Sequence, residues 1–161
     1  PESTDLPLHR GSLYLKNILI VKRLRSDLVF NALHGGKGEN GIVQGMLDSA
    51  GVPYTGSGRI ASMLAMQKEL SKQLFCHAKL PLPKGTVLDR LGASRNQVKK
   101  IALPLVVKPN DQGSTIGLSV VENSSDLETA IEKAFRFGAK VIVEEYIPGR
   151  EITVSILKKR T

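Results

Sequence analysis

The sequence predicts an α/β segment followed by an α+β segment, and three observations predict it. A mostly apolar run, Asp27–Leu33, leads through a glycine-rich loop into a helical pattern at Ile42–Ala50. Further along, short apolar runs are separated by connections too short for a helix, which is typical of antiparallel hairpins. The composition changes between these two patterns at Val52–Gly58, so this loop is the best internal boundary.

In the amino-terminal segment, Asp27–Leu33 is predicted to be a parallel strand buried on both faces, because most of its residues are apolar. The loop His34–Gly41 carries too many glycines for regular structure. Ile42–Ala50 is predicted to be a helix with its apolar residues on one face, and Gly51 ends it.

The middle of the chain is predicted to form two consecutive helices, Arg59–Met66 and Lys68–Lys79. The proline-rich sequence LPLPK ends the second helix, and Thr86–Leu88 begins a strand. A short helix is expected over Ser94–Ile101, with Ser94 as its N-cap.

A hairpin follows, with strands at Leu105–Lys108 and Leu118–Val121 around a loop that contains glycine. Ser125 and Glu128 have the spacing of a capping box, which predicts a helix running to about Phe137.

Two further strands are predicted, Lys140–Tyr146 and Glu151–Leu157, on either side of a Pro-Gly turn. The chain begins at Pro1 rather than Met and stops at Thr161 directly after a strand pattern. We therefore expect both ends to be cut from a longer protein.

The net charge and the amino-acid composition limit the classes of molecule that this protein is expected to bind. The 23 basic and 15 acidic residues give a net charge of +8, which favours an anionic partner, although an ordinary solvated cationic surface explains the same number. Aromatic residues make up only 4% and there is no tryptophan, so a base-stacking nucleic-acid surface is not expected. No apolar stretch approaches the roughly 20 residues of a membrane span, and no secretory signal is visible. The single cysteine fits a reducing cytoplasm.

Lys108 stands at the end of a predicted buried strand and is followed by a flexible polar loop with Gly113, Ser114 and Thr115. Backbone N–H groups and hydroxyls in such a loop suit phosphate oxygens, and the ammonium would add a point charge. A lysine at a sheet edge that reaches water is the alternative. The spacing is not that of a Walker A loop.

The adjacent acids Glu144 and Glu145 lie where a strand meets a turn, a place that plain surface residues also occupy. The functional interpretation is that backbone groups of this segment form hydrogen bonds with the edge of a purine base, while Glu144 or Glu151 accepts a hydrogen bond from a ribose hydroxyl. His34 lies at the carboxyl end of a predicted parallel strand, where α/β proteins place ligands, and the next helix offers its N-terminus to an anion.

These motifs resemble one family. HGGKGENGIVQG, PYTGSG, AMQK, VVKPNDQGSTIG and VEEYIPGREITV occur in the order and at the spacing typical of D-alanine–D-alanine ligases, members of the ATP-grasp superfamily. The likeness covers roughly Asp27 to Leu157. It implies a partial ATP-grasp fold, with an amino-terminal parallel α/β domain and a central ATP-grasp subdomain.

The resemblance implies ATP-dependent joining of two D-alanines through an acyl phosphate, for peptidoglycan precursor synthesis in the cytoplasm. His34 is similar to the residue beside the first D-alanine carboxylate, and Ser114 to the loop serine that orients this substrate. Lys68 and Lys108 are similar to the two lysines that reach the nucleotide phosphates.

At the end of the chain, Glu144, Tyr146 and Ile147 match the positions that read adenine, and Glu151 matches the carboxylate that holds the ribose. Gln67 departs from the family, which usually has an acid there. The resemblance also implies Mg²⁺, with ligands beyond Thr161, and a homodimer for the full-length protein.

Three domains are expected: part of a substrate domain over 1–56, a nucleotide-binding domain over 57–145, and the first strands of a catalytic domain over 146–161. The 161-residue chain alone is expected to be inactive. Two alternatives remain open, another ATP-grasp carboxylate–amine ligase of the D-Ala-D-Lac or D-Ser type, and an inactive nucleotide-binding fragment.

Overall fold

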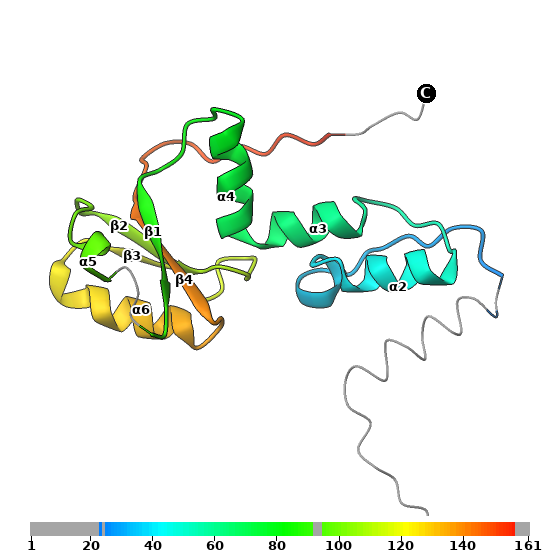
Figure 1. Cartoon of the computed structure of the whole chain (residues 1–161), viewed down its shortest axis with the longest axis horizontal. Helices are drawn as coiled ribbons and strands as arrows, with labels where there is room; N and C mark the ends of the chain where they lie inside the picture. The colour runs from blue at the N-terminus through cyan, green and yellow to red at the C-terminus, as the bar shows by residue number, and fades with distance from the viewer. Residues whose placement is uncertain (1–22, 24, 92–94, 157–161) are drawn as a thin grey trace, which may run out of the picture.

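The structure is a computed structural model that describes residues 23, 25–91 and 95–156. A sheet with two helices lies at one end, helix α2 (Ile42–Ala50) lies at the other, and α3 (Arg59–Met66) and α4 (Lys68–His77) connect them (Figure 1). The bounds of α2 and α3 are those predicted, and α4 ends two residues earlier than expected.

The amino-terminal part is built on α2. Val43 and Leu47 are buried on one face of this helix and pack against Val52. Gly51 ends the helix in the left-handed conformation, with φ 69°, as the sequence predicts. A short 3-10 helix, η1 (Gly36–Gly38), stands within the glycine-rich loop before α2.

The predicted buried strand at Asp27–Leu33 is wrong in its burial. Among the described residues this segment makes a single parallel bridge, between Val29 and Tyr54. Leu28 and Phe30 are 57% and 78% exposed. Val29 packs against the buried residues of α2, whereas Leu28 and Phe30 lie on the other face of the segment, which no described element buries.

The second part is a four-stranded sheet with the order β1-β4-β2-β3, and every neighbouring pair is antiparallel. Its strands are β1 (Gly85–Asp89), β2 (Leu105–Pro109), β3 (Ser119–Val121) and β4 (Lys140–Glu145). The β2–β3 pair is the predicted hairpin, now confirmed.

One face of the sheet carries the hydrophobic core. Helices α6 (Leu127–Phe135) and α5 (Arg95–Val98) cover this face, and α6 buries four of its residues. Alternate strand residues point into this core because side chains along a strand alternate between faces. The core consists of Leu88, Val98, Leu105, Val107, Val121, Ala130, Ile131, Ala134, Phe135, Val141 and Val143.

The opposite face of the sheet is more polar and is approached by α4. Antiparallel pairing sets Val106 opposite Glu144 and Lys108 opposite Ile142. Lys108 and Glu144 are therefore diagonal neighbours on one face. None of the ten residues of α4 is fully buried, so this helix does not pack closely against the sheet.

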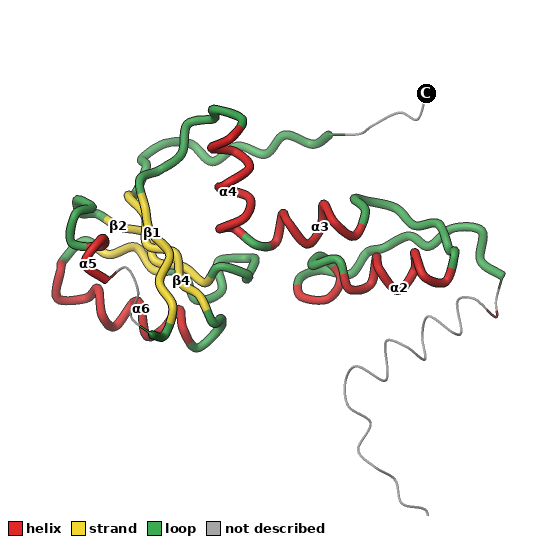
Figure 2. Tube along the Cα trace, viewed as in Figure 1, coloured by secondary structure: helices red, strands yellow, loops and turns green. Residues whose placement is uncertain are grey.

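Three other details differ from the predictions. Residues 151–156 form no strand, and Figure 2 shows the chain beyond β4 as a loop. The capping box is also wrong: a 3-10 helix, η2 (Ser124–Asp126), precedes α6, and no side chain caps α6. Ser125 instead contacts Asp126. The predicted cap Ser94 and the last predicted strand residue, Leu157, lie outside the described residues.

In the part of the chain that the structure describes, no helix combines the length and the apolar character needed to cross a membrane.

Candidate functional site

A cavity of about 400 Å³ lies between α4 and the polar face of the sheet. Three lysines line it, Lys68 and Lys72 from α4 and Lys108 from β2. Apolar side chains form another part of the wall, and Glu144 of β4 is the one acid in the lining. The lining residues are Ala65, Lys68, Ser71, Lys72, Phe75, Leu82, Pro83, Lys108 and Glu144.

Glu144 forms ion pairs with two of the lysines that line this cavity. It is only 5% exposed, and each of its oxygens meets a different lysine. Lys108 Nζ donates to Oε1 at 2.5 Å, and Lys72 Nζ donates to Oε2. Burial raises the pKa of Glu144, but the hydrogen bonds from Lys108 and Lys72 outweigh it and hold the pKa below its ordinary value of 4.5. The carboxylate is therefore charged at neutral pH.

Gly85 makes room for this buried acid. It lies opposite Glu144 in the β1–β4 pair, and a Cβ at Gly85 would lie 2.7 Å from the Glu144 Cβ. A glycine inside a strand often marks such a close approach. The glycine therefore lets β1 pass over Glu144 and cover it.

Lys68 stands at the start of α4, where the loop after β2 meets the helix. Its ammonium donates to the carbonyl of Gln112. Burial lowers the pKa of Lys68, and the positive charge of Lys108 lowers it further, against the opposing effect of Asp111 and Glu144. The negative charge of an anion bound in this cavity would compensate for both effects by attracting the ammonium, so the electrostatics favour an anionic ligand.

Asn110 fastens the loop to α4, and the sequence analysis did not find it. It is 3% exposed, its Oδ1 accepts the Glu69 N–H at 2.8 Å and its carbonyl accepts the Lys68 N–H at 3.1 Å. These are helix N–H groups that have no partner inside the helix. Asn110 Nδ2 also donates to Gln67 Oε1 at 2.6 Å. The Gln67 amide thus helps to hold Lys68 in place.

His34 and Ser114 meet although 80 residues separate them. His34 Nε2 and Ser114 Oγ share a hydrogen bond of 3.1 Å, and Nδ1 lies 3.2 Å from Glu39 Oε1. Ser114 and Thr115 both have positive φ values, 49° and 60°, which turn the loop sharply. The contact joins the glycine-rich loop of the amino-terminal part to the loop between β2 and β3.

The predicted nucleotide residues after β4 lie apart from the cavity lining. Tyr146 and Ile147 are 42% and 61% exposed, and Glu151 is exposed. The Tyr146 N–H donates to the carbonyl of Pro104 at 3.0 Å. Their role in reading adenine and ribose stays a prediction.

Lys72 is a second residue that the sequence analysis missed. It lies one helical turn after Lys68 on the same face of α4, so the spacing of the two lysines contains the information. As for a metal ion, residues 23, 25–91 and 95–156 contain no group of three His, Cys, Asp or Glu side chains able to hold one.

Comparison with known proteins agrees with this fold. A family model described as D-ala D-ala ligase C-terminus matches residues 74–161, and one described as D-ala D-ala ligase N-terminus matches residues 15–57. The D-alanine–D-alanine ligase of Trichlorobacter lovleyi is 45% identical over 140 residues, which cover 86% of this chain and 44% of that protein. The enzyme of Desulforudis audaxviator is also 45% identical, over 87% of this chain and 47% of that protein.

Two solved structures show the same architecture. The D-alanine–D-alanine ligase of Bacillus anthracis complexed with ATP has a TM-score of 0.74 and 35% identity, over 83% of this chain and 45% of that chain. The VanG D-Ala:D-Ser ligase of Enterococcus faecalis has a TM-score of 0.73 and 37% identity, over 76% of this chain and 37% of that chain.

The antiparallel sheet with its lysine-lined cavity is thus part of an ATP-grasp fold. More specifically, the chain belongs to the D-alanine–D-alanine ligase family, since one family model alone matches more than half of it. The chain spans slightly less than half the length of the curated relatives it matches.

Proposed function

We propose that this chain is part of an ATP-dependent D-alanine–D-alanine ligase and contains a large share of its nucleotide site. The observation that carries the proposal is the convergence of Lys68, Lys72 and Lys108 on one cavity of about 400 Å³. Ammonium groups are suited to polyphosphate oxygens, and apolar walls such as Phe75 and Leu82 suit the flat face of a base.

The residues divide the work as follows. Lys68 and Lys108 bind the phosphates, and Glu144, Tyr146 and Ile147 lie on the side of the base, with Glu151 toward the ribose. Phosphoryl transfer depends mainly on positioning and charge stabilisation, which the lysines supply. ATP, when bound, would supply the phosphoryl group that activates a carboxylate.

His34 and Ser114 form the substrate side of the proposed site. Their hydrogen bond holds the glycine-rich loop against the loop after β2, and we assign to both residues the orientation of the first D-alanine. The described residues do not fit a Mg²⁺ site, because no three of their His, Cys, Asp or Glu side chains form a group able to hold a metal ion.

The biological setting follows from the same family membership. We propose cytoplasmic synthesis of a peptidoglycan precursor by a homodimeric enzyme. We also propose the domain division 1–56, 57–145 and 146–161; the amino-terminal family model ends at residue 57, close to the first boundary.

Nucleotide binding is tested on the chain itself by its melting temperature. At ATP concentrations near 100 times the Kd, the free energy of unfolding rises by about 2.7 kcal/mol, which corresponds to a rise of roughly 5–10 °C for a chain of this size. Lys108→Ala should abolish the rise, whereas Lys99→Ala, an exposed lysine outside the cavity lining, should keep it. An equal rise in both variants would refute the site.

Ligase activity is tested on the protein expressed from the complete gene that carries this sequence. Phosphate release from ATP should require D-alanine, and L-alanine should not replace it. No release above background with D-alanine would refute the proposal.

A second candidate, D-alanine–D-serine ligation, is favoured by the likeness to the Enterococcus faecalis D-Ala:D-Ser ligase, which is 37% identical. Adding D-serine or D-lactate as the second substrate in the same assay, with the products separated by chromatography, decides between these specificities.

A further inference from the structure

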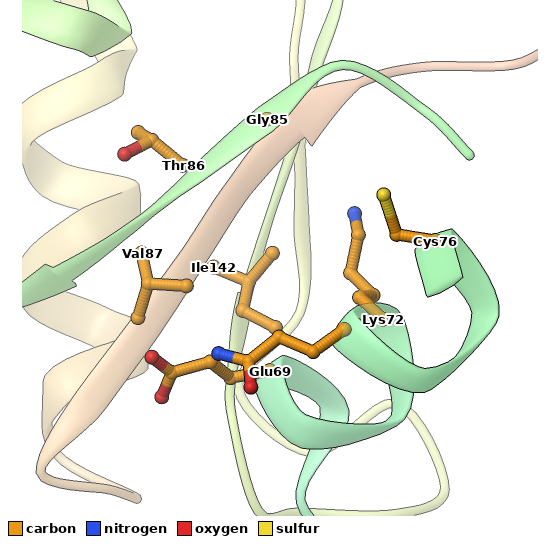
Figure 3. A pocket seen from close by; sticks show the side chains of 8 residues that line it. Glu69, Lys72, Cys76, Gly85, Thr86, Val87 and Ile142 are labelled. Atoms are coloured by element: carbon orange, nitrogen blue, oxygen red, sulfur yellow. The ribbon is translucent and has the colours of Figure 1, made fainter.

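Lys72 lies between two cavities and is the residue that their linings share. Beside the lysine-rich cavity, a second one of about 300 Å³ lies between α4 and strands β1 and β4. Its lining includes Glu69 and Cys76 of α4 and Ile142 of β4. Figure 3 shows the Lys72 side chain extending from α4, with Cys76 one turn further along the helix and Ile142 on the strand.

Lys72 lines both cavities and pairs with Glu144, which lines the lysine-rich one. Lys72 donates to Oε2 of the Glu144 carboxylate and Lys108 donates to Oε1. The buried negative charge is therefore balanced by two cations. The Lys72 and Lys108 side chains are 26% and 24% exposed, and both line the lysine-rich cavity. Neither lysine alone determines where the carboxylate points.

A second ion pair joins the same helix to the same strand without reaching the lysine-rich cavity. Lys140 Nζ donates to Glu69 Oε2 at 2.6 Å, and the Lys140 side chain is 49% exposed. Both pairs fasten α4 to β4, but only the Lys72–Glu144 pair lines the cavity proposed to bind nucleotide. The Lys140–Glu69 pair therefore provides a control for effects on helix attachment alone.

We propose that Lys72 is a positioning residue of the nucleotide site, which holds Glu144 by one oxygen and so keeps the Lys108 ammonium available to phosphate. This inference rests on the proposed function. With Lys72 in place, Glu144 is balanced by two cations, and Lys68 adds a third positive charge to the cavity. Without Lys72, both oxygens of Glu144 are left to Lys108, which holds the Lys108 ammonium against the carboxylate and away from a bound phosphate.

The test compares ATP affinity by isothermal titration calorimetry in the unaltered chain and its variants. Lys72→Met keeps the aliphatic stem and removes the charge, and we expect a loss of about tenfold in ATP affinity. Lys72→Arg should restore most of the affinity, because a guanidinium also pairs with a carboxylate. Lys140→Met should bind ATP as the unaltered chain does.

A double-mutant cycle separates positioning from direct contact with the phosphates. If Lys72 acts through Glu144, Lys72→Met should cause less than about a twofold further loss in a Glu144→Gln background. A full tenfold loss in that background would show that Lys72 contacts the ligand itself and would overturn the positioning role. Lys72→Gln carries the same expectations and replaces Lys72→Met if that variant loses its cooperative melting.

The outcomes for the inference and for the proposed function are distinct. An unaltered chain that does not bind ATP refutes the nucleotide site and this inference with it. An unaltered chain that binds ATP, together with Lys72→Met of equal affinity, leaves the nucleotide site standing and refutes the role of Lys72. If Lys140→Met loses as much ATP affinity as Lys72→Met, the effect comes from weaker attachment of α4 to β4, and this result also refutes the role of Lys72.

Discussion

Glu144→Gln removes the one negative charge that Lys72 and Lys108 share, and the resulting loss of stability can be worked out from the structure. Two charge-assisted hydrogen bonds disappear or weaken, and each is worth about 1.5–3 kcal/mol. Breaking a fully buried ion pair costs about 3–5 kcal/mol, but both lysines keep roughly a quarter of their surface in water and can turn toward it. We therefore expect a loss of about 2–3 kcal/mol at pH 7.

The dependence on pH identifies the cause of this loss. The pKa of Glu144 is lowered in the folded chain, so its contribution to stability is complete above the ordinary value of 4.5 and disappears as the pH falls through the folded pKa. The gap in free energy of unfolding between the unaltered chain and Glu144→Gln should therefore be largest at pH 7 and shrink as the pH falls below the ordinary value of 4.5.

Urea unfolding followed by circular dichroism at pH 7, 5.5 and 3.5 measures this gap. Glu69→Gln is the matched control, since it breaks the more exposed pair with Lys140 and should cost no more than about 1 kcal/mol. A gap below about 0.5 kcal/mol at pH 7, or one of equal size at pH 3.5, would refute the account of Glu144 as a charged and paired acid.

Three further predictions test the fold around the site. Gly41→Ala should lower the free energy of unfolding, measured in urea, by about 2–3 kcal/mol. Gly41 has φ 87°, and an added Cβ would lie 2.5 Å from the Arg59 carbonyl oxygen. The control Gly113→Ala, with open space around the added Cβ, should change the free energy of unfolding by no more than about 0.5 kcal/mol. Cys76 is exposed and should react with Ellman's reagent in the native chain, and a thiol that reacts only after denaturation would contradict its placement. Val107→Ala should cost about 2–3 kcal/mol in the same urea experiment, because Val107 is completely buried in the core, and a loss below about 0.5 kcal/mol would contradict that burial.

Local sequence patterns predicted the elements that depend on local interactions. The bounds of α2 follow from its apolar spacing and the glycine that ends it, and the β2–β3 hairpin follows from two short apolar runs around a turn. The same patterns failed where a distant partner decides the outcome. The alternation over 151–156 favours a strand, yet Ile152, Val154 and Ile156 are all highly exposed, and no described strand pairs with this segment. Alternation makes a strand favourable, but only hydrogen bonds to a neighbour form one.

The site shows the same division between local and distant information. Lys68 and Lys108 were found from their motifs, whereas the Lys108–Glu144 pair depends on the β2–β4 register, which joins residues 36 apart, and the Lys72–Glu144 pair depends on the packing of α4 beside β4. One local feature still pointed to them. In the sequence VIVE the acid follows three apolar residues of a strand, and the structure buries all four.

A buried carboxylate is costly unless cations pair with it, so a glutamate at such a position implies basic side chains converging from elsewhere in the fold. Lys108 was one candidate, from a strand that ends in a lysine. Lys72 was the other, because it lies one helical turn after a lysine already assigned to the phosphates. Burial of Glu144 and the spacing of the two helix lysines, considered together, predict the arrangement that neither motif predicts alone.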